Sequence, residues 1–151
     1  KVLGAIVAVL SRAMPMMDAV PLKRAWLTSC PEQLAKLEAD PLNYGGWIRN
    51  RTAHALLGLR AQCRALLPHW GKDFSFLLVH GGEDQVCPRS AVDSPMASSP
   101  SSDKQSHVYE GLLHEVLFEK RASRERATAD VLEFVTSRLA AARSKPLRSR
   151  L

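Results

Sequence analysis

Apolar residues recur at intervals of three and four in the middle of the chain, the spacing that places side chains on one face of a helix. Within residues 47–67 the recurring positions are Ile48, Thr52, Leu56, Leu59, Cys63 and Leu66. Pro68 ends the pattern, because proline disfavours helical backbone at the residue before it. This stretch therefore predicts a long amphipathic helix.

Two further segments have helical patterning. The first begins at Pro31, whose fixed φ suits the first position of a helix, and continues to the Asp40-Pro41 step. The second runs from residue 123 to about residue 143, with Ser123 as the expected N-cap. Its apolar face comprises Ala127, Val131, Phe134, Val135 and Leu139. Each of these helices needs another element to cover its apolar face.

The chain opens with an apolar run, residues 2–10, after a single lysine. This run is too short to cross a bilayer, which needs about 20 apolar residues. A signal peptide fits poorly, since one lysine is a minimal charged region and residues 11–17 lack a small-x-small cleavage site. We therefore expect a buried helix at this end.

Two strands are predicted in the second half. Residues 74–80 form a continuous apolar run closed by Gly81-Gly82, and this strand is expected to be buried on both faces. Residues 106–109 form a shorter strand closed by Gly111. About 25 residues separate the two, which is enough for the crossover that parallel neighbours require. The crossover holds two prolines and a serine cluster, so it predicts a poor and partly frayed helix.

These elements indicate an α/β fold with an incomplete sheet. A parallel sheet is normally covered on both faces, and two strands alone are marginally stable. The pattern therefore implies further strands that the 151 residues do not contain. We expect the chain to be part of a larger fold.

Composition and cysteine content are those of an ordinary soluble domain. A chain of 151 residues with 46% hydrophobic residues can bury about 70% of its unfolded surface. The cysteines, Cys30, Cys63 and Cys87, are odd in number and have no C-x-x-C spacing. They indicate neither a zinc site nor a disulfide framework, which favours a reducing compartment.

The formal net charge of +6 is concentrated partly in the tail from Arg143 onward, RSKPLRSRL, which holds four basic residues and no acid. Such a block can attract phosphates or anionic lipid headgroups. No aromatic residues interleave with it to stack on bases. A solvated terminus is therefore favoured, and no nucleic-acid partner is expected.

The candidate chemistry lies just after the two strands. Asp84 follows the first strand and His114 follows the second, 30 positions later. An acid and then a histidine are two members of a hydrolase triad, but no G-x-S-x-G turn occurs to supply the serine. Glu83 is a rival acid, and plain structural roles remain open, a turn former for Asp84 and a packed loop histidine for His114. The His-Gly-Gly at residues 80–82 is better explained as a strand-ending glycine pair than as an oxyanion motif.

Three segments together resemble one family. Residues 40–57, DPLNYGGWIRNRTAHALL, resemble the D-P-L-x-Y-x-G-x-x-R-x-R-T cap segment of monoacylglycerol lipases and lysophospholipase-like serine hydrolases, which are grouped with the serine aminopeptidases. Residues 77–88, LLVHGGEDQVCP, resemble that family's strand and acid turn. Residues 101–119, SSDKQSHVYEGLLHEVLFE, resemble its last strand and histidine segment. With the opening helix, the resemblance extends to about Leu139.

The resemblance implies the C-terminal part of an α/β-hydrolase fold, with cap helices, the last two parallel strands and the closing helix. The implied division is a cap or lid with its connection at residues 1–70, a core segment at residues 71–143 and a basic tail at residues 144–151. It implies that Asp84 orients His114 and that His114 is the general base of an ester hydrolysis, with no cofactor and no metal. Without the serine, the chain alone is expected to be inactive.

The resemblance also implies a substrate class and a location. The substrate would be a small lipid or acyl ester, with residues 2–10 and 14–17 among the apolar lining of an acyl channel. The cap helices would provide any peripheral membrane contact, and the cytoplasm or a membrane periphery is the favoured location. The alternative is a non-catalytic binding or interaction protein that kept the cap and lost the nucleophile, with its basic tail serving an acidic partner.

Overall fold

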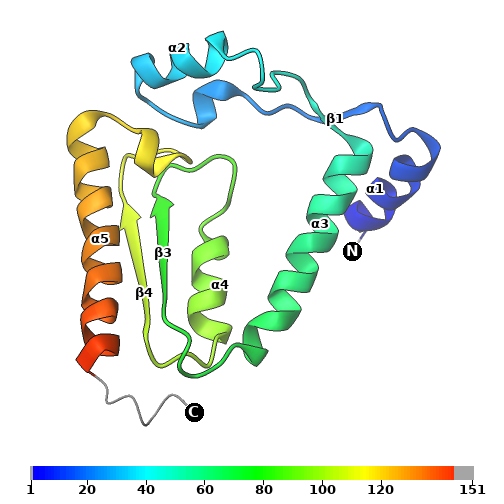
Figure 1. The fold of residues 1–151 in the computed structure, drawn as a ribbon. Coiled ribbons are helices and arrows are strands. Elements are labelled where there is room, and N and C mark those ends of the chain that lie inside the picture. Colours follow the sequence, from blue (N-terminus) through cyan, green and yellow to red (C-terminus); the bar gives the residue numbers. More distant parts are fainter. Residues whose placement is uncertain (1, 145–151) are drawn as a thin grey trace.

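A two-stranded parallel sheet organises the C-terminal half of the computed structural model, which describes residues 2–144 (Figure 1). β3 (Phe76–Gly81) and β4 (Lys104–Tyr109) run parallel, from Phe76 opposite Lys104 to Gly81 opposite Tyr109. The parallel pairing predicted from the sequence is confirmed, although β3 starts two residues later and β4 two residues earlier than predicted. Because the two strands end opposite each other, the segments that follow them leave the sheet at one rim.

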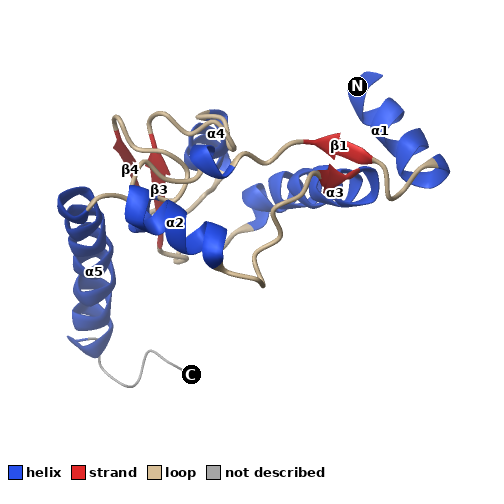
Figure 2. Ribbon diagram, turned by 90° about the horizontal axis from the view of Figure 1, so that it is seen from above, coloured by secondary structure: helices blue, strands red, loops and turns tan. Residues whose placement is uncertain are grey.

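Helices lie on opposite sides of this sheet (Figures 1 and 2). One is α4 (Ser90–Ser98), the crossover between the strands, and the other is α5 (Arg121–Ser144). Between α5 and the sheet lies a small core of Tyr109, Val116 and Ala127, with Val79 and Leu112 packed against it. Two parallel strands with helices on opposite sides are the α/β arrangement with an incomplete sheet that the sequence predicts.

The crossover helix forms despite its composition. Pro95 lies within α4, where its missing N–H removes one helical hydrogen bond. The helix ends at Ser98, and Ser99 N–H bonds to the Pro95 carbonyl. A poor and partly frayed helix was expected. The helix is short, but all nine of its residues are helical.

The N-terminal half forms a separate layer of helices. α1 (Val2–Ala13) packs along α3 (Asn50–Leu66), and next to them β1 (Asp18–Val20) pairs antiparallel with β2 (Ile48–Arg49). An ion pair between Asp18 and Arg49 joins these short strands, which the sequence did not predict. The prediction of a buried first helix is wrong in its burial, since Ile6 is 50% and Val9 is 64% exposed.

The remaining helices agree with the patterning in position. α2 (Pro31–Ala39) has the predicted bounds, and it lies at the top of Figure 1, beyond the ends of β3 and β4. α5 begins at Arg121 and its first helical bond runs from Arg124 N–H to the Lys120 carbonyl, so Ser123 is not the N-cap. Three short 3₁₀ turns complete the elements of residues 2–144: η1 (Arg24–Trp26), η2 (Leu67–His69) and η3 (Val116–Phe118).

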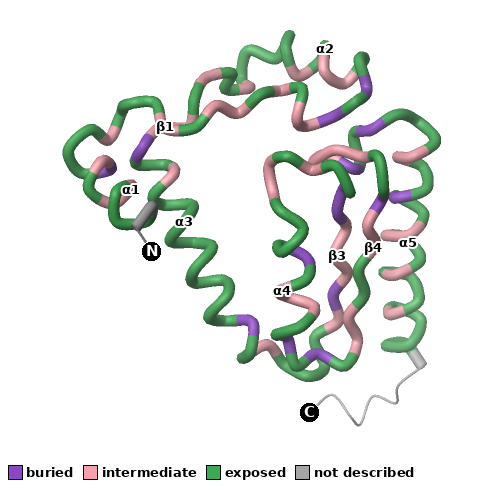
Figure 3. The backbone as a smooth tube through the Cα atoms, turned by 180° about the vertical axis from the view of Figure 1, so that it is seen from behind, coloured by how far each residue is buried: buried purple, intermediate pink, exposed green. Residues whose placement is uncertain are grey.

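Burial is concentrated around the sheet. In Figure 3 the buried segments gather at β3, β4 and the loops above them, whereas α3 is exposed almost throughout. The apolar face predicted for α3 is therefore uncovered, with Leu56, Leu59 and Leu66 each at least half exposed. Within residues 2–144 no helix has the length and apolar character needed to cross a membrane. Residues 145–151, most of the predicted basic tail, lie outside the described residues.

Candidate active site

The site lies at the rim where the two strands end. Asp84 follows β3 by three residues, and His114 follows β4 by five. Backbone hydrogen bonds join the two loops, from Gly82 N–H to the Tyr109 carbonyl at 2.8 Å and from Glu83 N–H to the Leu112 carbonyl at 2.9 Å. The loop carrying the acid and the loop carrying the histidine are thus held against each other by backbone alone.

Gly81 is needed because these loops cross so closely. A Cβ built on Gly81 would lie 2.0 Å from the Leu113 carbonyl oxygen and 2.5 Å from that of Leu112. Its φ is negative, so the requirement is one of space and not of backbone conformation. Gly111 is the one described glycine with positive φ, 77°, and it turns the chain between β4 and His114. The strand-ending role predicted for the glycine pair agrees with this geometry.

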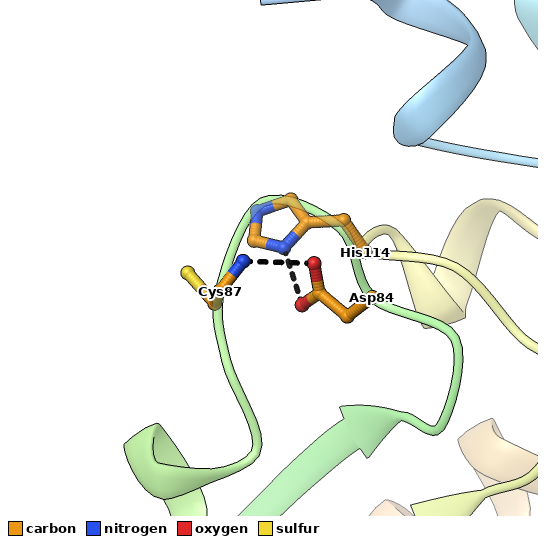
Figure 4. A group of neighbouring side chains, drawn as sticks. All are labelled: Asp84, Cys87 and His114. Atoms are coloured by element: carbon orange, nitrogen blue, oxygen red, sulfur yellow. Dashed lines mark hydrogen bonds and ion pairs between the residues drawn. The ribbon is translucent and has the colours of Figure 1, made fainter.

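Asp84 and His114 are hydrogen-bonded. The distance from His114 Nδ1 to Asp84 Oδ2 is 2.8 Å (Figure 4). The Asp84 side chain is 2% exposed and that of His114 is 31% exposed. The acid is therefore enclosed, while the imidazole reaches the surface of the described chain.

The second oxygen of Asp84 is held by its own turn. Oδ1 accepts hydrogen bonds from Val86 N–H at 2.7 Å and from Cys87 N–H at 2.9 Å. Burial acts to raise the pKa of Asp84, but the hydrogen bonds from Cys87, His114 and Val86 outweigh it and lower the pKa. Asp84 is thus a carboxylate at neutral pH, with one oxygen directed at the imidazole.

The rival acid and the other histidines occupy different positions. Glu83 is exposed, and its backbone rather than its carboxylate takes part in the loop contact. His80, buried at the end of β3, has its Nδ1 3.6 Å from Asp84 Oδ2. His107 pairs with Asp130 at 3.3 Å on the α5 side of the sheet. His54 lies on α3, and His69 in η2.

A buried glutamate anchors the histidine loop. Glu119 is 0% exposed, and its carboxylate accepts hydrogen bonds from Leu113 N–H at 3.1 Å and from Ser29 Oγ at 2.6 Å. Ser29 N–H also donates to it, at 3.1 and 3.2 Å. Glu119 thereby joins the segment before α2 to the residue directly before His114. Sequence reasoning missed this contact, since nothing in the string VLFEK marks its glutamate as buried.

The family is decided by comparison with known proteins. The model of the family described as serine aminopeptidase, S33, matches residues 1–121. The chain belongs to this family. The resemblance inferred from residues 40–57, 77–88 and 101–119 is thereby confirmed.

Relatives of this S33-family chain include lipases. It is 29% identical over 140 residues to a monoacylglycerol lipase of Mycolicibacterium smegmatis, covering 91% of the chain and 48% of that protein. Two solved structures are similar in fold, each at 19% identity and a TM-score of 0.73. One is a soluble variant of monoglyceride lipase from Saccharomyces cerevisiae in complex with a substrate analog, covering 91% of this chain and 47% of that one. The other is a monoacylglycerol lipase of Paleococcus ferrophilus, with 90% and 52% covered. The chain thus spans about half the length of these relatives.

In this S33-family chain a thiol lies beside the acid and the histidine. Cys87 follows Asp84 by three residues, and its Sγ lies within 4.8 Å of ligand atoms of both Asp84 and His114. Burial, and then the charge of Asp84, raise the pKa of Cys87, so it rests as a neutral thiol. The sequence-based interpretation of the cysteines rested only on their number and their spacing from one another; an aspartate followed by a cysteine three residues later in a turn was the available signal.

A depression in the surface lies elsewhere in the described structure. It has a volume of about 400 Å³, is lined by Ser11, Arg12, Pro15, Arg51 and His54, and lies between α1 and α3. None of these residues contacts Asp84 or His114 in the described structure. The rim of the sheet is therefore identified as the candidate active site by the geometry and charge of its side chains, and not by a surface pocket.

Proposed function

We propose that these residues are the acid and histidine half of a serine ester hydrolase whose substrate is a lipid ester of the monoacylglycerol type. The observation that carries the proposal is the 2.8 Å hydrogen bond between His114 Nδ1 and the enclosed carboxylate of Asp84. The nucleophile would be a serine in a part of the protein outside the 151 residues. The names of the relatives support the lipid substrate.

The chemistry follows from the tautomer that this hydrogen bond favours. With Nδ1–H donated to Asp84, the lone pair of His114 lies on Nε2. Nε2 would take the proton of the serine hydroxyl during attack on the ester carbonyl, and later return it to the leaving alcohol. Asp84 would remain ionised throughout, and it would stabilise the imidazolium that forms. The hydrogen bonds from Cys87, His114 and Val86, which lower the pKa of Asp84, support this role.

The N-terminal helices are proposed to be the cap. Residues 1–70 would cover the acyl chain of the substrate, while residues 71–143 would belong to the hydrolase core. Ala5, Ile6, Val9 and Leu10 line an apolar depression of about 310 Å³ on α1, which supports contact with an acyl chain or with a lipid surface. The exposed methionines Met14, Met16 and Met17 adjoin it along the chain.

The test supplies the part of a related lipase that this chain does not cover. A fusion to the N-terminal part of the M. smegmatis lipase would be assayed on a short-chain activated ester and on a monoacylglycerol. We expect turnover in the fusion, and none after His114→Ala, with substrate binding retained. The matched control, His69→Ala, removes a histidine from η2 and should leave turnover unchanged. Near-normal activity of His114→Ala would refute the assignment of His114 as the base, whereas a folded fusion without turnover would favour a non-catalytic binding protein.

The acid is tested in the same fusion. Asp84→Asn keeps the shape but favours the wrong imidazole tautomer, so kcat should fall by about 10⁴-fold, as in a chymotrypsin-type triad. Glu83→Gln, one residue earlier, should change kcat little because Glu83 is exposed. A larger loss from Glu83→Gln than from Asp84→Asn would transfer the role of the acid to Glu83.

A further inference from the structure

Three different metal-binding side chains meet at the rim of the sheet. One ligand atom each from Asp84, Cys87 and His114 lies within 4.8 Å of the other two (Figure 4). Among the described residues, no other set of three or more His, Cys, Asp or Glu side chains meets this criterion. A carboxylate oxygen, a thiol sulfur and an imidazole nitrogen are the three donors found in zinc sites.

The grouping is held by the backbone. Cys87 N–H donates to Asp84 Oδ1 at 2.9 Å, which fixes the cysteine on the turn that begins at the acid. His114 N–H bonds to the Trp26 carbonyl at 3.4 Å, and Leu113 N–H bonds to the buried Glu119. The backbones that carry the three side chains therefore keep their separation without any ion between them.

We propose that Asp84, Cys87 and His114 form a binding site for a thiophilic divalent cation of the zinc type. Three protein ligands leave one tetrahedral position for water. That position is open, because the His114 side chain is 31% exposed. The thiolate and imidazole select zinc, cadmium or cobalt over magnesium and calcium, which prefer oxygen ligands.

Binding requires only local movement. In a zinc tetrahedron the ligand atoms stand about 3.3–3.6 Å apart, given metal–ligand distances of about 2.0–2.3 Å. Figure 4 shows the Cys87 sulfur turned away from the carboxylate, so rotation about its Cα–Cβ bond would bring it to the ion. The ion would take the place of the proton between Asp84 and His114 Nδ1. That proton would move through solvent to Nε2, which keeps the imidazole neutral, and the Cys87 thiol would release its proton to solvent.

The site would compete with the proposed chemistry. With an ion on the carboxylate and the imidazole, His114 could not accept a proton from a serine. This consequence rests on the proposed function, whereas the binding itself does not, because it involves only residues of this chain.

Cobalt titration of the full 151-residue chain under reducing conditions tests the binding, since a thiolate ligand gives Co²⁺ an intense near-ultraviolet charge-transfer band. We expect the band to saturate at one ion per chain and to disappear when Zn²⁺ is added. Cys87→Ser should abolish the band. His114→Ala should weaken binding by at least about 10-fold, because losing even a residue that only hydrogen-bonds to a metal ligand costs about that much affinity. Cys63→Ser, which alters an exposed cysteine on α3, should leave the band unchanged.

The outcomes separate the two proposals. Absence of the band in the wild-type chain, its persistence in Cys87→Ser or its loss in Cys63→Ser would overturn the metal site. Cys87→Ala is a second variant that removes the thiol. Both Cys87 variants are checked by circular dichroism, so that loss of the band is not attributed to a folding defect. In the fusion, Zn²⁺ should suppress ester turnover by the parent and not by Cys87→Ala. A cobalt band with a fusion that never turns over would leave the metal site standing and refute the hydrolase proposal.

Discussion

The Asp84 carboxylate is bound by two different kinds of donor, one at each oxygen. Backbone N–H groups of Val86 and Cys87 hold Oδ1, while Oδ2 faces the imidazole of His114. The backbone donors keep the carboxylate ionised even though its side chain is 2% exposed. The acid is therefore oriented by residues next to it in sequence, and it needs no other part of the protein to point at the histidine.

The position of the His114 loop depends on a second carboxylate, that of Glu119, which does not contact the imidazole itself. The buried Glu119 carboxylate accepts four hydrogen bonds, of which one comes from Leu113 N–H and three from the backbone and hydroxyl of Ser29. Thr28 Oγ1 donates to the Phe118 carbonyl at 2.9 Å and reinforces the same junction. A buried carboxylate is tolerated only with such partners, so the junction is sensitive to change at this one side chain.

Glu119→Ala should destabilise the chain by about 3 kcal/mol or more, because it leaves buried donors of Ser29 and Leu113 without an acceptor. Urea unfolding of the variant measures the change. Glu125→Gln, on the exposed Arg121–Glu125 pair of α5, is the matched control and should fall within about 0.5 kcal/mol of wild type. The His114 ring resonances should also shift in Glu119→Ala and not in Glu125→Gln. A loss of stability with unchanged His114 resonances would show that Glu119 does not position the histidine.

At the scale of elements, the two loops after β3 and β4 form one unit. Their backbones cross at Gly81, where the Leu113 carbonyl occupies the space of a side chain. The crossing brings Leu113, and with it His114, over the end of β3. The parallel pairing of β3 and β4 thus places the acid and the histidine at the same rim of the sheet. Because Gly81 has no side chain, the two loops can approach closely there.

Gly81→Ala should displace the histidine loop, because its Cβ would lie 2.0 Å from a backbone oxygen, a distance that no rotamer change relieves. We expect a loss of about 2 kcal/mol or more in unfolding free energy, as for overpacked interiors. The His114 ring resonances should lose the signature of the Asp84 contact. Gly71→Ala, where nothing lies within 4 Å of the added Cβ, should have little effect. Equal stability of the two variants would contradict the crossing geometry.

The closing helix is tied to the start of β4 by charge. Arg138 donates to both oxygens of Asp103, from Nε at 3.0 Å and from Nη2 at 2.6 Å. The hydrogen bond from Arg138 is the main cause that lowers the pKa of Asp103 to about 2, from a usual value of 3.8. A lowered pKa means that the pair stabilises the folded chain above pH 3.8, and that this contribution is lost as the pH falls toward 2.

Asp103→Asn should therefore be less stable than wild type at pH 7, with a difference that shrinks between pH 3.8 and about 2. Urea unfolding of both proteins across this range measures the difference. Asp93→Asn breaks a pair whose side chains are 57% and 62% exposed, and it should have little effect at any pH. A difference that stays constant, or grows in acid, would rule out the proposed coupling of β4 to α5.

The elements could be predicted from the sequence where one local signal dominates. Pro31 and Asp40-Pro41 mark the two ends of α2, and the apolar run before Gly81 marks β3. Predictions were wrong where the signal is not local. Ser123 resembles an N-cap but lies inside α5, and residues 2–10 resemble a buried helix although α3 covers only part of it and Ile6 and Val9 stay exposed. Glu119 was missed for the same reason, because its partner Ser29 is far away along the chain. For Cys87 a local signal existed, its spacing of three residues from Asp84, but the contact with His114 depends on the fold.

At the scale of the whole molecule, the fold exposes more surface than its mass requires. A compact monomer of 16.7 kDa would expose about 7,600 Å², whereas this chain exposes 10869 Å². The excess includes large apolar side chains such as Leu42, Leu59 and Val9, each more than half exposed. Patches of this kind mark surfaces that contact other polypeptide or lipid. The apolar core of the described residues is small, and polar junctions at Glu119 and Asp103 join elements beside it.

The isolated chain should consequently melt with low cooperativity. A compact domain of 151 residues unfolds with an enthalpy of about 100 kcal/mol near 60 °C, because each residue contributes about 0.7 kcal/mol. The enthalpy reflects close packing, and α3 packs on little besides α1, so we expect less than half of that value from calorimetry. The exposed apolar surface should also bind a hydrophobic dye at room temperature. In the fusion with the lipase half, the transition should sharpen and dye binding should fall. A sharp transition with the full enthalpy in the isolated chain would mean that these 151 residues form a self-sufficient fold, and the proposal that they complete a larger sheet would fail.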